Sequence, residues 1–102
     1  MKIKQGVILS GLHPMMRRVL IEANVIWKEH GQELVVTSGL DGTHSAGSAH
    51  YYGCAMDLRT RYFTDIELSS IMIKLAQRLP TIYFIKLEKD HIHIHYRHPD
   101  WN

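Results

Sequence analysis

Apolar residues recur along the chain at spacings that predict two helices. Between residues 13 and 30 they fall three and four positions apart, which is typical of an amphipathic helix. Pro14 suits the first turn of this helix, and Gly31 suits its C-terminal end. A second helix is predicted to begin at the capping box formed by Thr64 and Glu67 and to end before Pro80. The expected core positions of the two helices are Met16, Val19, Leu20, Ala23, Ile26, Trp27, Leu68, Ile71, Met72, Leu75, Ala76 and Leu79.

Four short segments have the composition of strands. They cover residues 33–38, 54–59, 82–88 and 91–96, and the last two are joined by Lys89 and Asp90 in a predicted hairpin. Residues 39–48 contain three glycines and two serines and are predicted to form a loop. This order of elements predicts one α+β domain over residues 1–102, a small antiparallel sheet covered by two main helices.

Composition narrows the class of protein. With 102 residues, 45% hydrophobic and 22% charged, the chain is expected to form one soluble globular domain. A net charge of +2 without a cluster of Lys and Arg does not indicate a nucleic-acid partner. Residues 1–10 lack an adequate apolar core, so we expect no signal peptide, and no segment is long enough to span a membrane. These features predict synthesis in the cytoplasm.

Chemistry-bearing residues are concentrated in residues 48–57 and 90–95. The single cysteine, Cys54, excludes an internal disulfide and a zinc site built from cysteines. Alternation along a strand places His91, His93 and His95 on one face. If the strand that carries Asp57 lies next to this one, Asp57, His50 and one of the three histidines can meet around one ion. Three such ligands plus a water are typical of a catalytic zinc site.

The string Ser48-x-His50-x-x-Gly53-x-Ala55-x-Asp57, followed by a late His-x-His, resembles a family of zinc peptidases. These are the D-alanyl-D-alanine carboxypeptidases and the phage L-alanyl-D-glutamate endopeptidases, together called the LAS group. The resemblance covers roughly residues 34–97 and implies that His50 and Asp57 bind one Zn²⁺ ion.

The family's third ligand is a histidine on the late strand, with an acidic general base three residues before it in many members. His93 has Asp90 at this offset, whereas His91 has Glu88 and His95 has Ile92. The resemblance therefore implies His93 as the ligand and Asp90 as the base. His95 remains an alternative ligand and Glu88 an alternative base. His91 matches a histidine that donates a hydrogen bond near the metal or the transition state.

The resemblance also implies a peptidoglycan stem peptide as substrate, with Ser48, Tyr52 and Arg59 as candidate contacts. It leaves open whether the enzyme is a carboxypeptidase or an endopeptidase, and whether it is a phage endolysin or a bacterial remodelling enzyme. Its site of action would be the periplasm or the cell wall, reached through a holin-type export partner or in a virion. The oligomeric state stays open.

One departure from the family concerns the arginine that stabilises the oxyanion in many members. That arginine follows a Thr-Ser-Gly, but here Asp41 stands near its position after Thr37, Ser38 and Gly39. The sequence leaves Arg59, Arg61 and His44 as candidates for this role.

Two other interpretations compete with a peptidase. The chain could be a non-catalytic zinc-binding module on the same scaffold, or a general metal-binding protein that uses only the histidine row. The first differs from the peptidase at Asp90, which would then be an ordinary turn residue. The second predicts metal binding without His50 or Asp57, and Asp57 would then be a strand carboxylate paired with Arg59 or Arg61.

Overall fold

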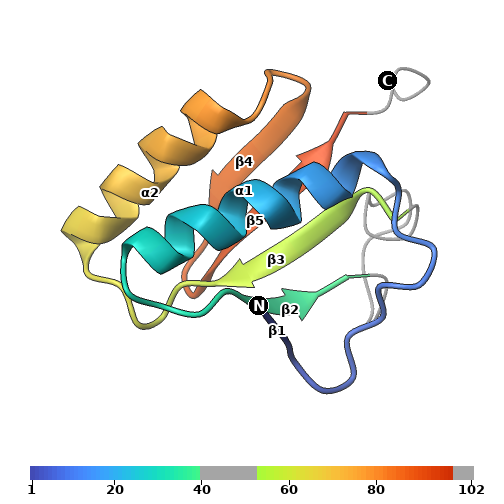
Figure 1. Ribbon diagram of the computed structural model, residues 1–102, viewed down its shortest axis with the longest axis horizontal. Helices are drawn as coiled ribbons and strands as arrows, with labels where there is room; N and C mark the ends of the chain where they lie inside the picture. The colour runs from blue at the N-terminus through green and yellow to red at the C-terminus, as the bar shows by residue number, and fades with distance from the viewer. Residues whose placement is uncertain (40–52, 98–102) are drawn as a thin grey trace.

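The structure is a computed structural model, and it describes residues 1–39 and 53–97. The predicted loop beyond Gly39 and the predicted site residues His44, Ser48, His50 and Tyr52 lie outside these ranges. The elements are β1 (Lys2–Ile3), α1 (Met15–Glu29), β2 (Val35–Ser38), β3 (Ala55–Arg59), α2 (Asp65–Arg78), β4 (Tyr83–Leu87) and β5 (His91–Tyr96). The strands form one sheet in the order β1-β2-β3-β5-β4 (Figure 1). The predicted α+β class is confirmed.

Both helices lie across the same face of the sheet (Figure 1). The core forms between them and that face. Met56 and Leu58 of β3 and Ile92 and Ile94 of β5 are fully buried in it together with Trp27 of α1. Because side chains alternate along a strand, the residues between these positions point to the opposite face, which neither helix covers. In the described part of the chain, no helix has the length and hydropathy needed to cross a membrane.

The ends of both helices follow from their flanking residues. Pro14 stands at the N-terminus of α1 with φ of −53°, and Gly31 follows the C-terminus with φ of +73°, a left-handed conformation that favours glycine. At the start of α2, the Thr64 hydroxyl accepts a hydrogen bond from the Glu67 N–H at 3.2 Å, and the Thr64 N–H donates to the Glu67 carboxylate at 3.1 Å. The predicted capping box is therefore confirmed.

One strand was not expected from the sequence. β1 pairs with β2 in parallel, with the Lys2 N–H donating to the Leu34 carbonyl at 2.7 Å and the Lys4 N–H to the Val36 carbonyl at 2.9 Å. The predicted sheet was antiparallel throughout, whereas the sheet of the structure has this one parallel pair at its edge. Two residues are too few to show an alternating pattern, so this strand could not be predicted from the sequence. Its hydrogen bonds to β2 hold it in the sheet.

Gly53 brings the chain into β3 and gives a testable consequence. Its φ is +71°, and a Cβ at this position would collide with the carbonyl of Gly11. The Gly53 carbonyl also accepts a hydrogen bond from the His13 N–H at 2.8 Å, which ties this turn to the segment before α1. Gly53→Ala should lower the free energy of unfolding by at least about 1–3 kcal/mol, the usual cost of such a backbone conformation for other residues.

The matched control is Gly31→Ala, at φ of +73° but with no atom within 4 Å of the added Cβ. Denaturant unfolding of both variants separates the backbone strain, which they share, from the collision with Gly11. Equal losses in the two variants would show that the close approach of Gly11 and Gly53 does not contribute.

Candidate metal centre

The strand that carries Asp57 lies next to the strand that carries the three histidines. A metal ion shared by Asp57 and one of these histidines requires this arrangement. β3 and β5 pair in antiparallel fashion, with Asp57 directly opposite His93. On the same face, Arg59 is opposite His91 and Ala55 is opposite His95. The buried isoleucines of β5 hold the other face in the core, so all three histidines stand on the face without helices. The pairing of these strands is therefore confirmed, and with it the shared face of Asp57 and the histidine row.

Asp57 and His93 face each other within hydrogen-bond distance. The Oδ1 atom of Asp57 is 3.0 Å from Nδ1 of His93. Ligand bonds of about 2.0–2.2 Å at tetrahedral angles place neighbouring ligand atoms roughly 3.3 Å apart. The two side chains are 15% and 21% exposed, so they are shielded but can be reached from solvent. In the structure the 3.0 Å contact is a hydrogen bond between the two side chains, and both residue types can bind zinc.

His95 is placed differently from His93. Its Nδ1 atom lies 2.9 Å from Nε2 of His93, and its ring stacks on Phe84 of β4 with centroids 4.7 Å apart. The Arg97 guanidinium also lies over the Phe84 ring, 5.4 Å from its centre. His95 has Ala55 as its strand partner instead of Asp57. The geometry therefore favours His93 over His95 as the ligand beside Asp57.

The third predicted ligand, His50, lies outside the described residues. Within residues 1–39 and 53–97, no group of three or more His, Cys, Asp or Glu side chains could hold a metal ion. The described part of the chain thus brings together two of the three predicted ligands. Zinc binding by the set His50, Asp57 and His93 stays a prediction.

Asp90 and His91 form a second polar pair beside Asp57. Nδ1 of His91 lies 2.7 Å from Oδ1 of Asp90, while Nε2 of the same ring lies 3.8 Å from Oδ1 of Asp57. The hydrogen bond with His91 lowers the pKa of Asp90 below its ordinary value. Asp90 is therefore a carboxylate at neutral pH, the form that a general base requires. The hairpin turn is held in place because the Thr60 N–H donates to the Asp90 carbonyl at 3.2 Å.

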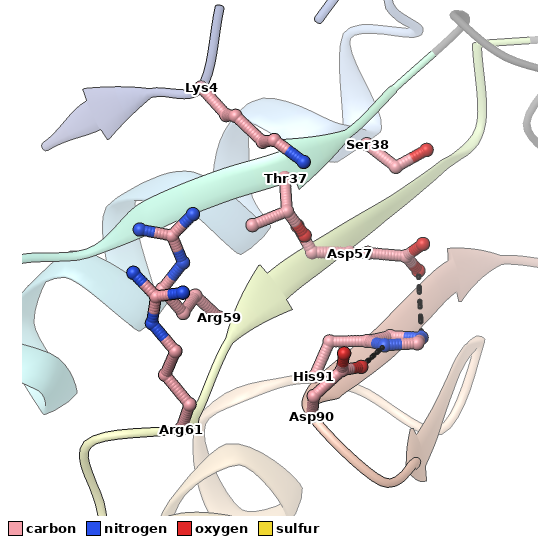
Figure 2. Close-up of a pocket in the computed structure, with 8 residues that line it drawn as sticks. All are labelled: Lys4, Thr37, Ser38, Asp57, Arg59, Arg61, Asp90 and His91. Atoms are coloured by element: carbon pink, nitrogen blue, oxygen red, sulfur yellow. Dashed lines mark hydrogen bonds and ion pairs between the residues drawn. The ribbon is translucent and has the colours of Figure 1, made fainter.

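These side chains border a pocket of about 260 Å³, drawn in Figure 2. Asp57, Asp90 and His91 form one side of it, and basic side chains form the other (Figure 2). The full lining is Lys4, Thr37, Ser38, Asp57, Arg59, Arg61, Asp90 and His91. Of the predicted substrate contacts, Arg59 lines this pocket, whereas Ser48 and Tyr52 lie outside the described residues.

Sequence reasoning missed Lys4 and gave no role to Thr37 or Ser38. Lys4 reaches the pocket only because β1 pairs with β2, and that strand left no readable pattern. Thr37 belongs to the Thr-Ser-Gly segment after which many LAS peptidases carry an arginine. Its hydroxyl donates to the Asp57 carbonyl at 3.3 Å. The register between β2 and β3 shifts between Val36 and Ser38, an irregularity that lies directly beside Asp57.

Comparisons with known proteins add no family to this picture. No family model matches the chain, and neither a curated protein nor a solved structure resembles it significantly.

Proposed function

We propose that the protein is a zinc-dependent peptidase that hydrolyses peptidoglycan stem peptides. The observation that carries the proposal is the pairing of Asp57 with His93 across β3 and β5, 3.0 Å apart on the uncovered face of the sheet. The carboxylate of Asp90 and the imidazole of His91 line the pocket that Asp57 borders. Two candidate metal ligands next to a candidate base are a large part of what metal-assisted hydrolysis needs, and His50 is the proposed third ligand.

His50, Asp57 and His93 are the proposed zinc ligands. Bound zinc supplies Lewis acidity, which polarises a peptide carbonyl and activates water at neutral pH. Asp57 is well placed for this role because Thr37 holds its backbone and His93 faces its carboxylate.

Asp90 is the proposed general base. Its carboxylate accepts a proton from the attacking water and passes it to the amine that leaves when the peptide bond breaks. His91 orients this carboxylate through the 2.7 Å contact with its Nδ1 atom. Glu88, the alternative base, instead pairs with Lys86 at 3.4 Å and does not line the pocket. The contacts of the two carboxylates therefore favour Asp90.

The substrate and the place of action come from the resemblance to the LAS peptidases. They are peptidoglycan stem peptides in the periplasm or cell wall, reached by a holin-type partner or in a virion. Lysis by a phage and remodelling by a bacterium both fit this chemistry.

Mass spectrometry of purified peptidoglycan after digestion by the zinc-loaded protein tests the proposal. We expect new termini at a single kind of stem-peptide bond, and these termini identify the bond as D-Ala-D-Ala or as L-Ala-D-Glu. Cleavage should stop when zinc is removed with a chelator and return when zinc is restored. A protein that binds zinc but releases no fragment from any stem peptide would instead be a non-catalytic zinc-binding module.

A further inference from the structure

We propose that Lys4, Arg59 and Arg61 form a carboxylate-binding subsite, so that the substrate carries a free carboxylate within about two residues of the bond that is cut. This inference rests on the proposed peptidase function and narrows its substrate class. It concerns the side of the pocket opposite to Asp90 and His91.

The three basic side chains reach the pocket from different parts of the chain. Lys4 follows β1, Arg59 ends β3, and Arg61 lies in the turn after β3. Figure 2 shows both guanidinium groups on the side of the pocket towards β2, with the Lys4 side chain extending over β2 towards Thr37. Residues that are far apart in the sequence thus bring three positive charges to one cavity.

The backbone holds each of these residues in place. The Lys4 N–H donates to the Val36 carbonyl at 2.9 Å, and the indole N–H of Trp27 donates to the Arg59 carbonyl at 3.2 Å. Arg61 lies in a tight turn that is closed by the Phe63 N–H donating to the Thr60 carbonyl at 2.9 Å. A subsite whose backbone is already ordered loses less entropy when it binds an anion.

Within the described part of the chain, no neighbouring carboxylate neutralises the charges of this group. Among residues 1–39 and 53–97, no carboxylate lies within 4.0 Å of the charged nitrogens of Lys4, Arg59 or Arg61. Other basic residues behave differently, since Arg78 pairs with two glutamates of α1 at 3.0 Å and 3.3 Å. Arginine presents a planar fork of donors that matches a carboxylate, so two adjacent arginines favour a carboxylate ligand.

The spacing along β3 limits where that carboxylate sits in the substrate. Asp57 and Arg59 share a face and are two positions apart, about 6.6–6.8 Å along a strand. An extended peptide advances about 3.3–3.6 Å per residue. A substrate bound with its cleaved bond near Asp57 therefore reaches the basic side chains within about two residues.

Two kinds of peptide satisfy this requirement. One ends in a free α-carboxylate just after the cleaved bond, and the other continues but has an acidic residue at that place. Four synthetic stem peptides distinguish them: each kind as the free acid and as the matched carboxamide. The measured quantity is kcat/KM of the zinc-loaded protein on each of the four peptides.

We expect amidation of the preferred peptide to lower kcat/KM of the wild-type protein about 10–100-fold, the range for a hydrogen bond to a charged group. Arg59→Gln and Arg61→Gln should remove this preference, so that the ratio of kcat/KM on the acid to kcat/KM on the amide falls by a similar factor. Lys86→Gln is the matched control, because Lys86 pairs with Glu88 and does not line the pocket. Circular dichroism melting shows whether each variant is folded.

Equal cleavage of acids and amides by the wild-type protein would overturn the subsite while leaving the peptidase function intact. If no peptide is cleaved, the peptidase function fails, and calorimetry decides the subsite separately. The probes are N-acetyl-D-alanine and N-acetyl-D-alaninamide. Tighter binding of the acid that is lost in Arg59→Gln supports the subsite, and equal or undetectable binding of both contradicts it.

Discussion

Replacing Asp57 by alanine should abolish stoichiometric zinc binding. The carboxylate lies 3.0 Å from Nδ1 of His93 and is only 15% exposed, so neighbouring water cannot supply an equivalent ligand in the same position. Loss of a partner that merely supports a ligand already costs about 10–100-fold in metal affinity. We therefore expect the affinity of Asp57→Ala for zinc to fall by more than about 100-fold, measured by competition with a chromogenic chelator.

The control for this experiment is Asp65→Ala, which removes an exposed carboxylate from the first turn of α2. His95→Ala provides the comparison with the alternative ligand. If Asp57→Ala keeps its zinc while His95→Ala loses it, the metal is held by the histidine row alone. That result would favour the general metal-binding protein over the peptidase.

Replacing Asp90 by asparagine should separate zinc binding from catalysis. Asparagine keeps the size of the side chain and its contact with His91 but cannot accept the proton of the attacking water. Positioned general bases contribute about 10²–10⁴-fold to rate. Asp90→Asn should therefore lose about 10²–10⁴-fold in kcat on a stem peptide and retain the zinc content of the wild-type protein.

Glu88→Gln is the matched control, since Glu88 is the other acidic residue in this hairpin and pairs with Lys86. It should keep nearly full activity. Loss of activity in Glu88→Gln together with full activity in Asp90→Asn would assign the base to Glu88. Full activity in both variants would remove the hairpin carboxylates from the mechanism.

Local patterns in the sequence were sufficient for the helices and for the faces of the strands. The capping box at Thr64 and the spacing of apolar residues in α1 report interactions within a few residues of each other. Strand alternation correctly placed Ile92 and Ile94 in the core and the histidines on the other face. The turn at Lys89 and Asp90 followed because only three residues, Glu88 to Asp90, separate β4 from β5.

Pairing between remote segments could not be read in the same way. From the sequence, the adjacency of β3 and β5 could be stated only as a condition for the metal site. Asp57 and His93 meet through the register of two strands that are not consecutive along the chain. β1 is too short to show a pattern in the sequence. The contribution of Lys4 to the basic side of the pocket could therefore not be predicted. The position of His50 relative to Asp57 stays a prediction.

The most direct test of the central claim is a zinc-edge anomalous diffraction map from crystals of the zinc-loaded protein. We predict one strong peak within about 2.0–2.2 Å of a carboxylate oxygen of Asp57 and of a ring nitrogen of His93 and of His50. A peak that involves His95 but not Asp57, or no peak on this face of the sheet, would contradict the account.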